Sequence, residues 1–396
     1  MESLKELYRI GTGPSSSHTM GPERAAHRFK EKYPQADRFL VTLYGSLAKT
    51  GKGHLTDDIL VKTFAPLPVE IRFDLSDKPL PHPNTLELTA IENDKEIGFE
   101  RVMSVGGGKI LSEGETEDAP ADVYPLSTFA DIKAYCASRH MRLWQYAEEC
   151  EGTEIWDYLK EVWRCMREAV TRGLETEGTL KGGLDVQRKA KMLYRQNHID
   201  ESAETRENRL VCAYAYAVSE QSAAGGVVVT APTCGASGVV PAVLRYMQEK
   251  HGFTDAEVLD ALATGGIIGN IIKTNASISG AQCGCQAEIG SACCMAAAAL
   301  AELFKMDLEQ IEYAAESAME HHLGLTCDPI RGLVQIPCIE RNAVAAMRAI
   351  GSLNLANFLT HTRKISFDMV VETMYQTGKD MNRIYRETSE GGLAKL

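Results

Sequence analysis

The stretch EIWDYLKEVWRCMREAVTRGLE, from Glu154 to Glu175, decides the fold class of this chain. Its large apolar residues recur at intervals of three and four, at Trp156, Leu159, Val162, Trp163, Met166 and Val170. This spacing places them in one stripe along an amphipathic helix. The alternation that is typical of strands fades at the same point, so we expect the architecture to change near residue 150.

Four later segments continue the helical pattern with smaller residues. They are AEVLDALATGGIIGNIIK, SACCMAAAALAELFKM, LEQIEYAAESAMEHHLG and RNAVAAMRAIGSLNLANFLTH. Each has helical spacing, and many of its positions are alanine or glycine, which indicates helices that approach one another closely. We therefore predict an all-helical domain over residues 151–396.

The first 150 residues mix helical and strand patterns. DRFLVTLYGSLA (Asp37–Ala48) and PVEIRFDL (Pro68–Leu75) alternate in the way strands do, and TLELTAIENDKEIGFERVMSV predicts two strands around a turn at Asn93 and Asp94. MGPERAAHRFKEKY, from Met20, predicts a helix with a proline near its start. We predict an α/β domain over residues 1–150, which makes the whole chain α+β.

Composition limits the partners of the protein. The chain has 396 residues and a formal net charge of −12 at pH 7. Nucleic acids and anionic membranes need a basic face, so neither is an expected partner. The longest apolar run, CCMAAAALA from Cys293, is too short to cross a bilayer, and the sequence shows no signal-peptide pattern. We expect a soluble, cytoplasmic protein.

Cysteine is frequent, and most of it lies late in the chain. Of eleven cysteines, seven follow residue 230: Cys234, Cys283, Cys285, Cys293, Cys294, Cys327 and Cys338. The odd number and irregular spacing favour reduced thiols over a disulfide framework. In GLTCDPIRGLVQIPCIERN (Gly324–Asn342), Cys327 and Cys338 each stand beside a proline, and they could be structural thiols, a disulfide or metal ligands. The intervals from Cys285 to Cys327 and on to Cys338, 42 and 11 positions, match no ferredoxin or zinc-finger spacing.

Two loops carry groups suited to chemistry. GTGPSSSHTMGP (Gly11–Pro22) places three serines and His18 before a helix, where hydroxyls and free backbone N–H groups can hold a carboxylate or phosphate. A capped turn explains the same pattern. YGSLAKTGKGH (Tyr44–His54) leaves a predicted strand through glycines and lysines and ends at His54, but it lacks the spacing of a nucleotide-binding P-loop.

Long motifs throughout the chain carry a family resemblance. They are GTGPSSSHTMGP, LYGSLAKTGKGH, SVGGGKI, AAGGVVVTAPTCGASGVVPAVL, NASISGAQCGCQAEIG, MEHHLGLTCDP, GLVQIPCIERNA and ETMYQTGKDMNRIYRETSEGGLA. With these motifs the sequence closely resembles the iron–sulfur L-serine dehydratases, bacterial enzymes that do not use pyridoxal phosphate. The resemblance implies an amino-terminal α/β part and a helical part that holds a catalytic 4Fe–4S cluster. It places the three thiolate ligands on Cys285, Cys327 and Cys338 and leaves one iron open as a Lewis acid.

The resemblance also implies a substrate site between the two parts. The substrate is expected to be a small amino acid, L-serine, which loses water by β-elimination to give pyruvate and ammonia. We predict that His54 is the general base that removes the α-proton, because a neutral imidazole titrates in the useful range. The residues expected to bind the substrate are Ser15, Ser16, Ser17, His18, Lys273, Asn275 and Arg341, with His18 also a catalytic candidate. We expect the protein to be an oxygen-sensitive homodimer. Its expected role is amino-acid degradation and gluconeogenesis.

Several positions depart from the family pattern. Cys234 and His322 stand where the family usually has asparagine, Cys283 where it has an apolar residue, and Arg331 where it has a small one. The family commonly continues to a cysteine near the carboxyl terminus, whereas this sequence ends at GGLAKL. We therefore expect the fourth iron to be open or capped by another group. L-Threonine and L-cysteine remain alternative substrates, and a non-catalytic amino-acid sensor is an alternative function.

Overall fold

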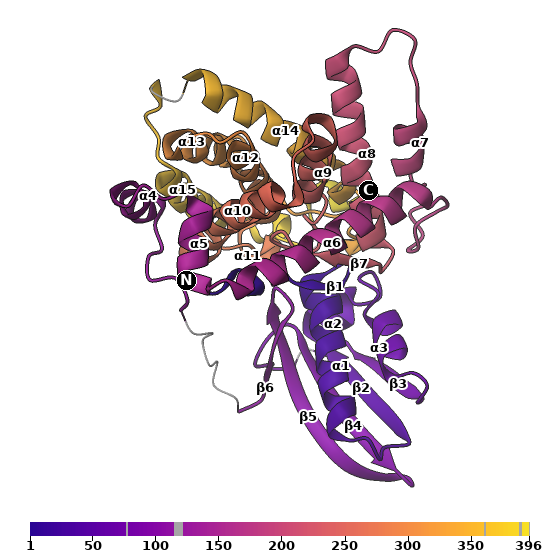
Figure 1. Ribbon diagram of the computed structural model, residues 1–396. Helices are drawn as coiled ribbons and strands as arrows, with labels where there is room; N and C mark the ends of the chain where they lie inside the picture. Colours follow the sequence, from indigo (N-terminus) through magenta and orange to yellow (C-terminus); the bar gives the residue numbers. More distant parts are fainter. Residues whose placement is uncertain (77, 115–121, 360–361, 388–389, 396) are drawn as a thin grey trace.

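The computed structural model describes residues 1–396 except 77, 115–121, 360–361, 388–389 and 396. It has two parts: a sheet with helices on one face, and a larger body of helices that packs against one end of that sheet (Figure 1). The α+β class predicted from the sequence is confirmed. No described helix is long and apolar enough to span a membrane.

The sheet has five strands in the order β3-β2-β4-β5-β6. Their bounds are β2 Arg38–Tyr44, β3 Val69–Asp74, β4 Thr85–Glu92, β5 Lys95–Gly106 and β6 Lys109–Ser112. β4 and β5 form the predicted hairpin, whose turn residues Asn93 and Asp94 have positive φ angles of 49° and 61°. Asparagine and aspartate tolerate this left-handed conformation better than most residues, which explains why the turn forms there.

One parallel pair of strands positions a predicted site residue. β2 and β3 run parallel, and the crossover between them contains α2 (Gly45–Thr50) and α3 (Thr56–Phe64). His54 lies in the turn between these helices. α3 and the predicted helix α1 (Gly21–Lys32) pack together over the sheet, and a small core forms from side chains such as Phe29, Phe39 and Phe64. α2, which precedes His54, lies at the end of the sheet that faces the helical body (Figure 1).

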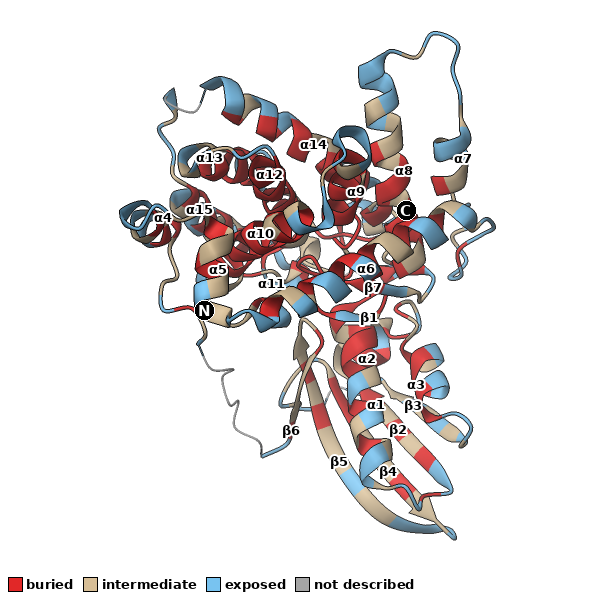
Figure 2. Ribbon diagram, viewed as in Figure 1, coloured by how far each residue is buried: buried red, intermediate tan, exposed pale blue. Residues whose placement is uncertain are grey.

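The helical body contains every helix predicted after residue 150. The longer helices are α6 Glu154–Glu175, α8 Ala203–Ala223, α9 Val239–His251, α10 Asp255–Asn275, α12 Ser291–Leu303, α13 Leu308–Glu320, α14 Cys338–Leu359 and α15 Phe367–Asp380. Shorter ones are α7 Ala190–Arg195, α11 Gly280–Cys283, η3 Gln286–Gly290, η4 Ile330–Gly332, η6 Arg383–Tyr385 and η7 Gly392–Lys395. Figure 2 shows the central helices α10 and α12 as largely buried.

Small residues let these central helices approach one another, as predicted. All of α12 is buried, and it packs against α10. A Cβ added to Gly265 of α10 would lie 2.7 Å from the backbone oxygen of Met295 in α12. Because real Cβ atoms do not come this close to backbone, glycine is required at that crossing.

The first twelve residues join the helical body rather than the sheet. They include η1 (Leu4–Glu6) and β1 (Ile10–Thr12), whereas η2 (Ser16–Met20) packs against α1 and β5 of the sheet part. β1 pairs antiparallel with β7 (Val227–Val229), a strand within the predicted all-helical region that the sequence did not reveal. Leu4, Leu7 and Tyr8 are buried in the core of the body.

Two helices before residue 150 also belong to the core of the body. They are α4 (Phe129–Ser138) and α5 (Leu143–Glu151), and both contribute buried side chains to it. The boundary near residue 150 therefore stays a prediction about domains, whereas the packing of buried side chains groups α4, α5 and the first twelve residues with the helices that follow.

Candidate active site

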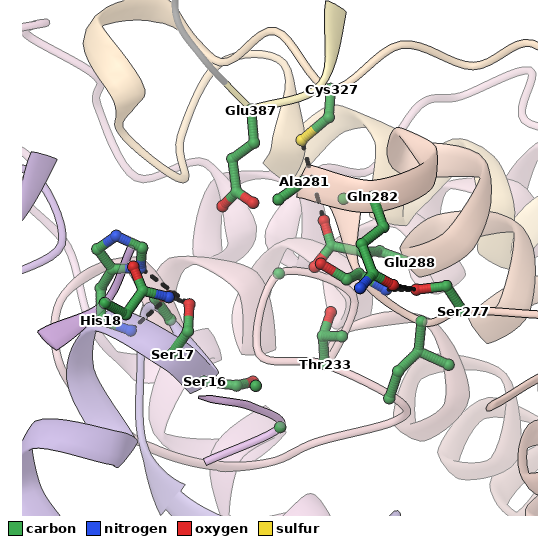
Figure 3. A pocket seen from close by; sticks show the side chains of 18 of the residues that line it. Ser16, Ser17, His18, Thr233, Ser277, Ala281, Gln282, Glu288, Cys327 and Glu387 are labelled. Carbon is green, nitrogen blue, oxygen red and sulfur yellow. Dashed lines mark hydrogen bonds between the residues drawn. The ribbon is translucent and has the colours of Figure 1, made fainter. Parts of the chain in front are cut away.

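A cavity of about 560 Å³ lies where the sheet part meets the helical body. The serine loop, which we define as residues 14–18, lines one side together with His54. Residues 276–282, Cys285 and Glu288 of the helical body line the other side. Figure 3 shows the serine loop facing Glu288 and Cys327 across the cavity, with Glu387 reaching in between them. The interface between the two parts, where we predicted the substrate site, therefore contains a cavity.

The hydroxyls of the serine loop are held by short-range contacts. Ser15 Oγ accepts a hydrogen bond from the backbone N–H of His18 at 3.1 Å, which is the capping contact expected at a helix start. Ser16 Oγ accepts from the backbone N–H of Cys234 at 3.2 Å and donates to its Sγ at 3.4 Å. Ser17 Oγ lies 2.9 Å from His18 Nδ1. The loop is thus both a capped turn and part of the cavity wall.

His18 and His54 form a buried pair with their ring centroids 4.5 Å apart. His18 Nε2 lies 2.9 Å from Ser46 Oγ, and His54 Nδ1 lies 3.1 Å from the carbonyl oxygen of Thr50. A carbonyl oxygen only accepts, so His54 Nδ1 carries the proton, and Nε2 of the neutral ring keeps a lone pair. Burial lowers the pKa of His54 to about 4. Burial first, and then neighbouring His54, hold the pKa of His18 well below its usual value.

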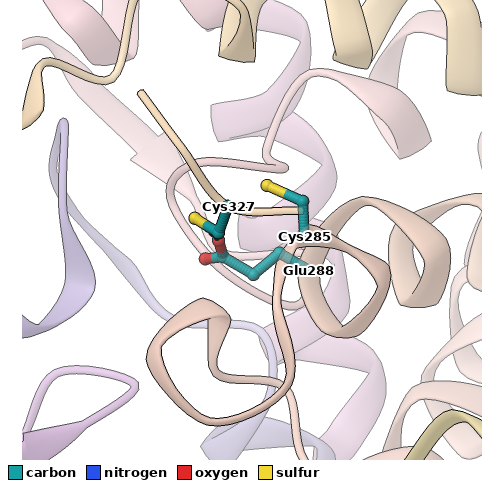
Figure 4. Close-up of side chains that lie close together, drawn as sticks. All are labelled: Cys285, Glu288 and Cys327. Atoms are coloured by element: carbon teal, nitrogen blue, oxygen red, sulfur yellow. Dashed lines mark hydrogen bonds between the residues drawn. The ribbon is translucent and has the colours of Figure 1, made fainter. Parts of the chain in front are cut away.

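The three predicted ligand thiols all line this one cavity. Cys285 precedes η3, Cys327 lies in the loop after α13, and Cys338 begins α14; all three are buried. The Sγ atoms of Cys285 and Cys327 and a carboxylate oxygen of Glu288 lie within 4.8 Å of one another (Figure 4). Cys338 lies outside this tight group. Burial, and next the nearby Cys285, hold the pKa of the Cys338 thiol well above its usual value, so this thiol ionises only beside a strong positive charge.

The residues that line the cavity fit an iron–sulfur cluster in two respects: they offer suitable donor atoms, and they leave open space beside them. Thiolates are the ligands of such clusters, and three of them are available on one cavity wall. Gly280 leaves room beside them: a Cβ there would lie 2.7 Å from Glu288 Oε2 and 3.0 Å from Cys327 Sγ. A larger residue at position 280 would fill the space next to the two donors.

The three other predicted substrate-binding residues are placed differently from one another. Lys273 lines the cavity, where its ammonium pairs with Glu2 and donates to the carbonyl of Glu6 at 3.2 Å. Asn275 is not among the lining residues, and its amide donates to the backbone oxygens of Ser127 and Ile271 at 2.6 and 3.0 Å.

Arg341 lies behind the thiols, also outside the cavity lining. It donates to the carbonyl of Thr326 at 2.6 Å and pairs with Asp328 at 3.1 Å, and its guanidinium is within hydrogen-bonding reach of Cys285. These contacts support the loop that carries Cys327. For Lys273, Asn275 and Arg341 alike, substrate binding stays a prediction.

Two carboxylates of the cavity were not anticipated. Glu288 follows Cys285 by three residues, which is one helical turn, so the motif CGCQAEIG did contain a signal for it. Glu387 comes from the end of the chain: its N–H donates to the carbonyl of Cys327 at 2.7 Å, and Cys327 N–H donates to the carbonyl of Tyr385 at 2.8 Å. Burial, with Glu288 next, raises the pKa of Glu387 to about 8.

The residues that depart from the family pattern have separate surroundings. Cys234 touches Ser16 of the serine loop and is the one closest to the site. Cys283 is buried against Gly378, whose added Cβ would lie 2.6 Å from the Cys283 thiol. His322 Nδ1 donates to the carbonyl of Ala318 at 2.7 Å, and Arg331 donates to that of Gly183 at 3.2 Å. Only the position of Cys234 bears directly on the serine loop.

Family models match nearly the whole chain. Residues 3–66 match the model described as "Serine dehydratase beta chain", and residues 84–394 match the "Serine dehydratase alpha chain". The chain belongs to the serine dehydratase family. The two models divide its length between them, with the serine loop and His54 in the first match and all three ligand candidates in the second.

Characterised relatives resemble the chain along its full length. "L-serine dehydratase 2" of Escherichia coli (strain K12) is 40% identical over 448 aligned positions, which include 100% of this chain and 98% of the relative. The "L-serine dehydratase" of Haemophilus influenzae is also 40% identical, covering 100% of this chain and 99% of the relative. That of Streptomyces coelicolor is 40% identical as well, with 99% and 98% coverage.

Proposed function

We propose that this member of the family is an L-serine ammonia-lyase that uses a 4Fe–4S cluster. The observation that carries the proposal is one cavity in which a neutral histidine pair faces three buried cysteines. The family match and the names of the full-length relatives support L-serine as the substrate. Cys285, Cys327 and Cys338 would hold the cluster, and no pyridoxal phosphate is needed.

The reaction has to overcome two barriers. The α-proton of serine is weakly acidic, and hydroxide is a poor leaving group. When bound, the cluster supplies a Lewis acid for the β-hydroxyl. The protein supplies the base: His54 is unprotonated at neutral pH because burial lowers its pKa, and its Nε2 lone pair is available to take the α-proton.

The other side chains of the cavity orient the substrate. The serine loop offers hydroxyls to the carboxylate of serine, and His18 lies beside them with both ring nitrogens near hydroxyls. When the Cα–H and Cβ–O bonds break, the Cα–H electron pair becomes the double bond of aminoacrylate. The α-proton passes to His54 Nε2 and is then returned to the departing hydroxyl, which leaves as water, so the step needs no other proton donor. Aminoacrylate then tautomerises and hydrolyses to pyruvate and ammonia.

Four further proposals concern location, assembly, oxygen sensitivity and metabolic role. The protein would act in the cytoplasm as a homodimer, and oxygen would inactivate it because an iron without a thiolate is readily lost on oxidation. Its role would be amino-acid degradation feeding gluconeogenesis. Size-exclusion chromatography with light scattering under anaerobic conditions tests the dimer directly.

The function itself is tested with anaerobically purified protein. We expect iron and sulfide in the protein, and pyruvate formation from L-serine that exceeds product formation from L-threonine and L-cysteine. His54→Gln should keep the cluster and lose a factor of about 10²–10⁴ in turnover, the usual contribution of a general base. His27→Gln is the matched control, because His27 is an exposed histidine of α1. Near-normal turnover in His54→Gln would remove the base assignment, and serine binding without turnover in the wild type would favour a sensor.

A further inference from the structure

Glu288 is placed as a ligand would be, although it was not among the ligands predicted from the sequence. It sits on the first turn of η3, three residues after Cys285. One of its carboxylate oxygens lies within 4.8 Å of the thiols of both Cys285 and Cys327, and Oε2 is 4.0 Å from Cys327 Sγ. Figure 4 shows the carboxylate and the Cys327 thiol side by side, with the Cys285 thiol close to them.

No cation of the described chain forms an ion pair with this carboxylate within 4.0 Å. Its neighbours are the hydroxyl of Thr233 and the thiol of Cys327. The charge of Arg341 acts on Glu288, but its guanidinium is engaged by Asp328 and by the carbonyl of Thr326. Glu288 is half-buried, and a carboxylate that is partly removed from water is stabilised when a positive charge lies next to it. A metal held by the adjacent thiols is such a charge.

Glycine keeps the space around this carboxylate open. A Cβ on Gly280 would lie 2.7 Å from Oε2, and a Cβ on Gly235 would lie 3.6 Å from Oε1. Side chains larger than glycine would therefore crowd the carboxylate from the side of residue 280. Glu288 lines the cavity, and its carboxylate lies toward the Cys327 thiol (Figure 3).

We propose that Glu288 supplies an oxygen ligand to the iron–sulfur cluster, at the iron that the three cysteines leave without a thiolate. The inference rests on the proposed function, because it needs the cluster. Carboxylate oxygens bind iron less tightly than thiolates do in such a soft-donor site, so this ligand can give way when the hydroxyl of the substrate arrives. Glu387 lines the same cavity but is not within the group of mutually close donors, which makes it the matched control.

The test uses the holoenzyme, reconstituted anaerobically, with ⁵⁷Fe placed only at the iron that is lost on mild oxidation. Mössbauer spectra are recorded without substrate for the wild type, Glu288→Gln, Glu288→Cys and Glu387→Gln. In Glu288→Cys the isomer shift of the labelled iron should fall toward that of thiolate-bound iron. In Glu288→Gln the spectrum of this iron should change, and a chelator should remove the iron at least about tenfold faster. Glu387→Gln should match the wild type in both measurements.

The outcomes separate this inference from the function on which it rests. If the wild type and both Glu288 variants give the same spectrum and the same rate of iron loss, Glu288 is not a ligand, while the cluster and the lyase activity stand. If the wild type assembles no cluster, the proposed function and this inference both fail. Circular dichroism identifies any variant that does not fold, and the conservative Glu288→Gln change keeps the test usable if Glu288→Cys is lost.

Discussion

Burial of His54 should make the protein sensitive to acid, and the size of the effect follows from the structure. The pKa of His54 is lowered from 6.5 to about 4 in the folded protein. As the pH falls below 6.5, His54 binds a proton in the unfolded chain but not in the folded chain. The stability contributed by the neutral ring is therefore complete above pH 6.5 and is lost as the pH falls toward 4.

The perturbation is His54→Gln, which removes the titration but keeps an N–H that can donate to Thr50. With the two pKa values above, the wild type should lose about 2 kcal/mol at pH 5 and about 3 kcal/mol at pH 4 relative to neutral pH, through this group alone. The variant should lack this loss. At pH 7 the titration of His54 should contribute little to any difference in the free energy of unfolding between the two proteins. The ring is mostly neutral there in both the folded and the unfolded state.

Urea unfolding monitored by far-UV circular dichroism at pH 7 and pH 5 measures the effect. The free energies of unfolding are compared between the wild type and His54→Gln at each pH, under the same anaerobic conditions. Acid-sensitive groups away from this pair act in both proteins and cancel to first order. His18 is the exception, because the part of its lowered pKa that comes from His54 is lost in the variant, which weakens the acid sensitivity of the variant further. Parallel pH dependences in the two proteins would show that His54 has an ordinary pKa, and the argument for a neutral, buried base would fail.

Three further predictions concern the thiol side of the cavity. Cys327→Ala should lose both iron and brown colour, whereas Cys293→Ala on buried α12 should keep both; normal iron content in the first variant would remove Cys327 as a ligand. Gly280→Ala should lower iron content and cost about 1–3 kcal/mol of stability, because its methyl group would press on Glu288 and Cys327; an unchanged iron content would show that the space is not needed. Air should inactivate the enzyme, and ferrous iron with a reductant should restore it; full activity after aerobic chelator treatment would contradict a cluster mechanism.

Local patterns were enough to predict several of the longer helices and four strands of the sheet. The amphipathic stripe of α6, the strand alternation of β2 and the hairpin turn at Asn93 and Asp94 each depend on residues close together in sequence. The alanine and glycine content of α10 and α12 likewise predicted their close packing. The pairing of β1 with β7 was not predicted, because its two strands are three residues each and lie more than two hundred positions apart.

For the site, the sequence by itself determined which groups were available: a serine loop, two loop histidines and a set of cysteines that family motifs singled out. Only the tertiary structure decided how they meet. It placed His54 beside His18, brought Cys285 and Cys327 to one cavity, and turned Glu288 toward them. The physical reason is that these contacts join distant segments, so their geometry depends on packing the sheet part onto the helical body rather than on any local pattern.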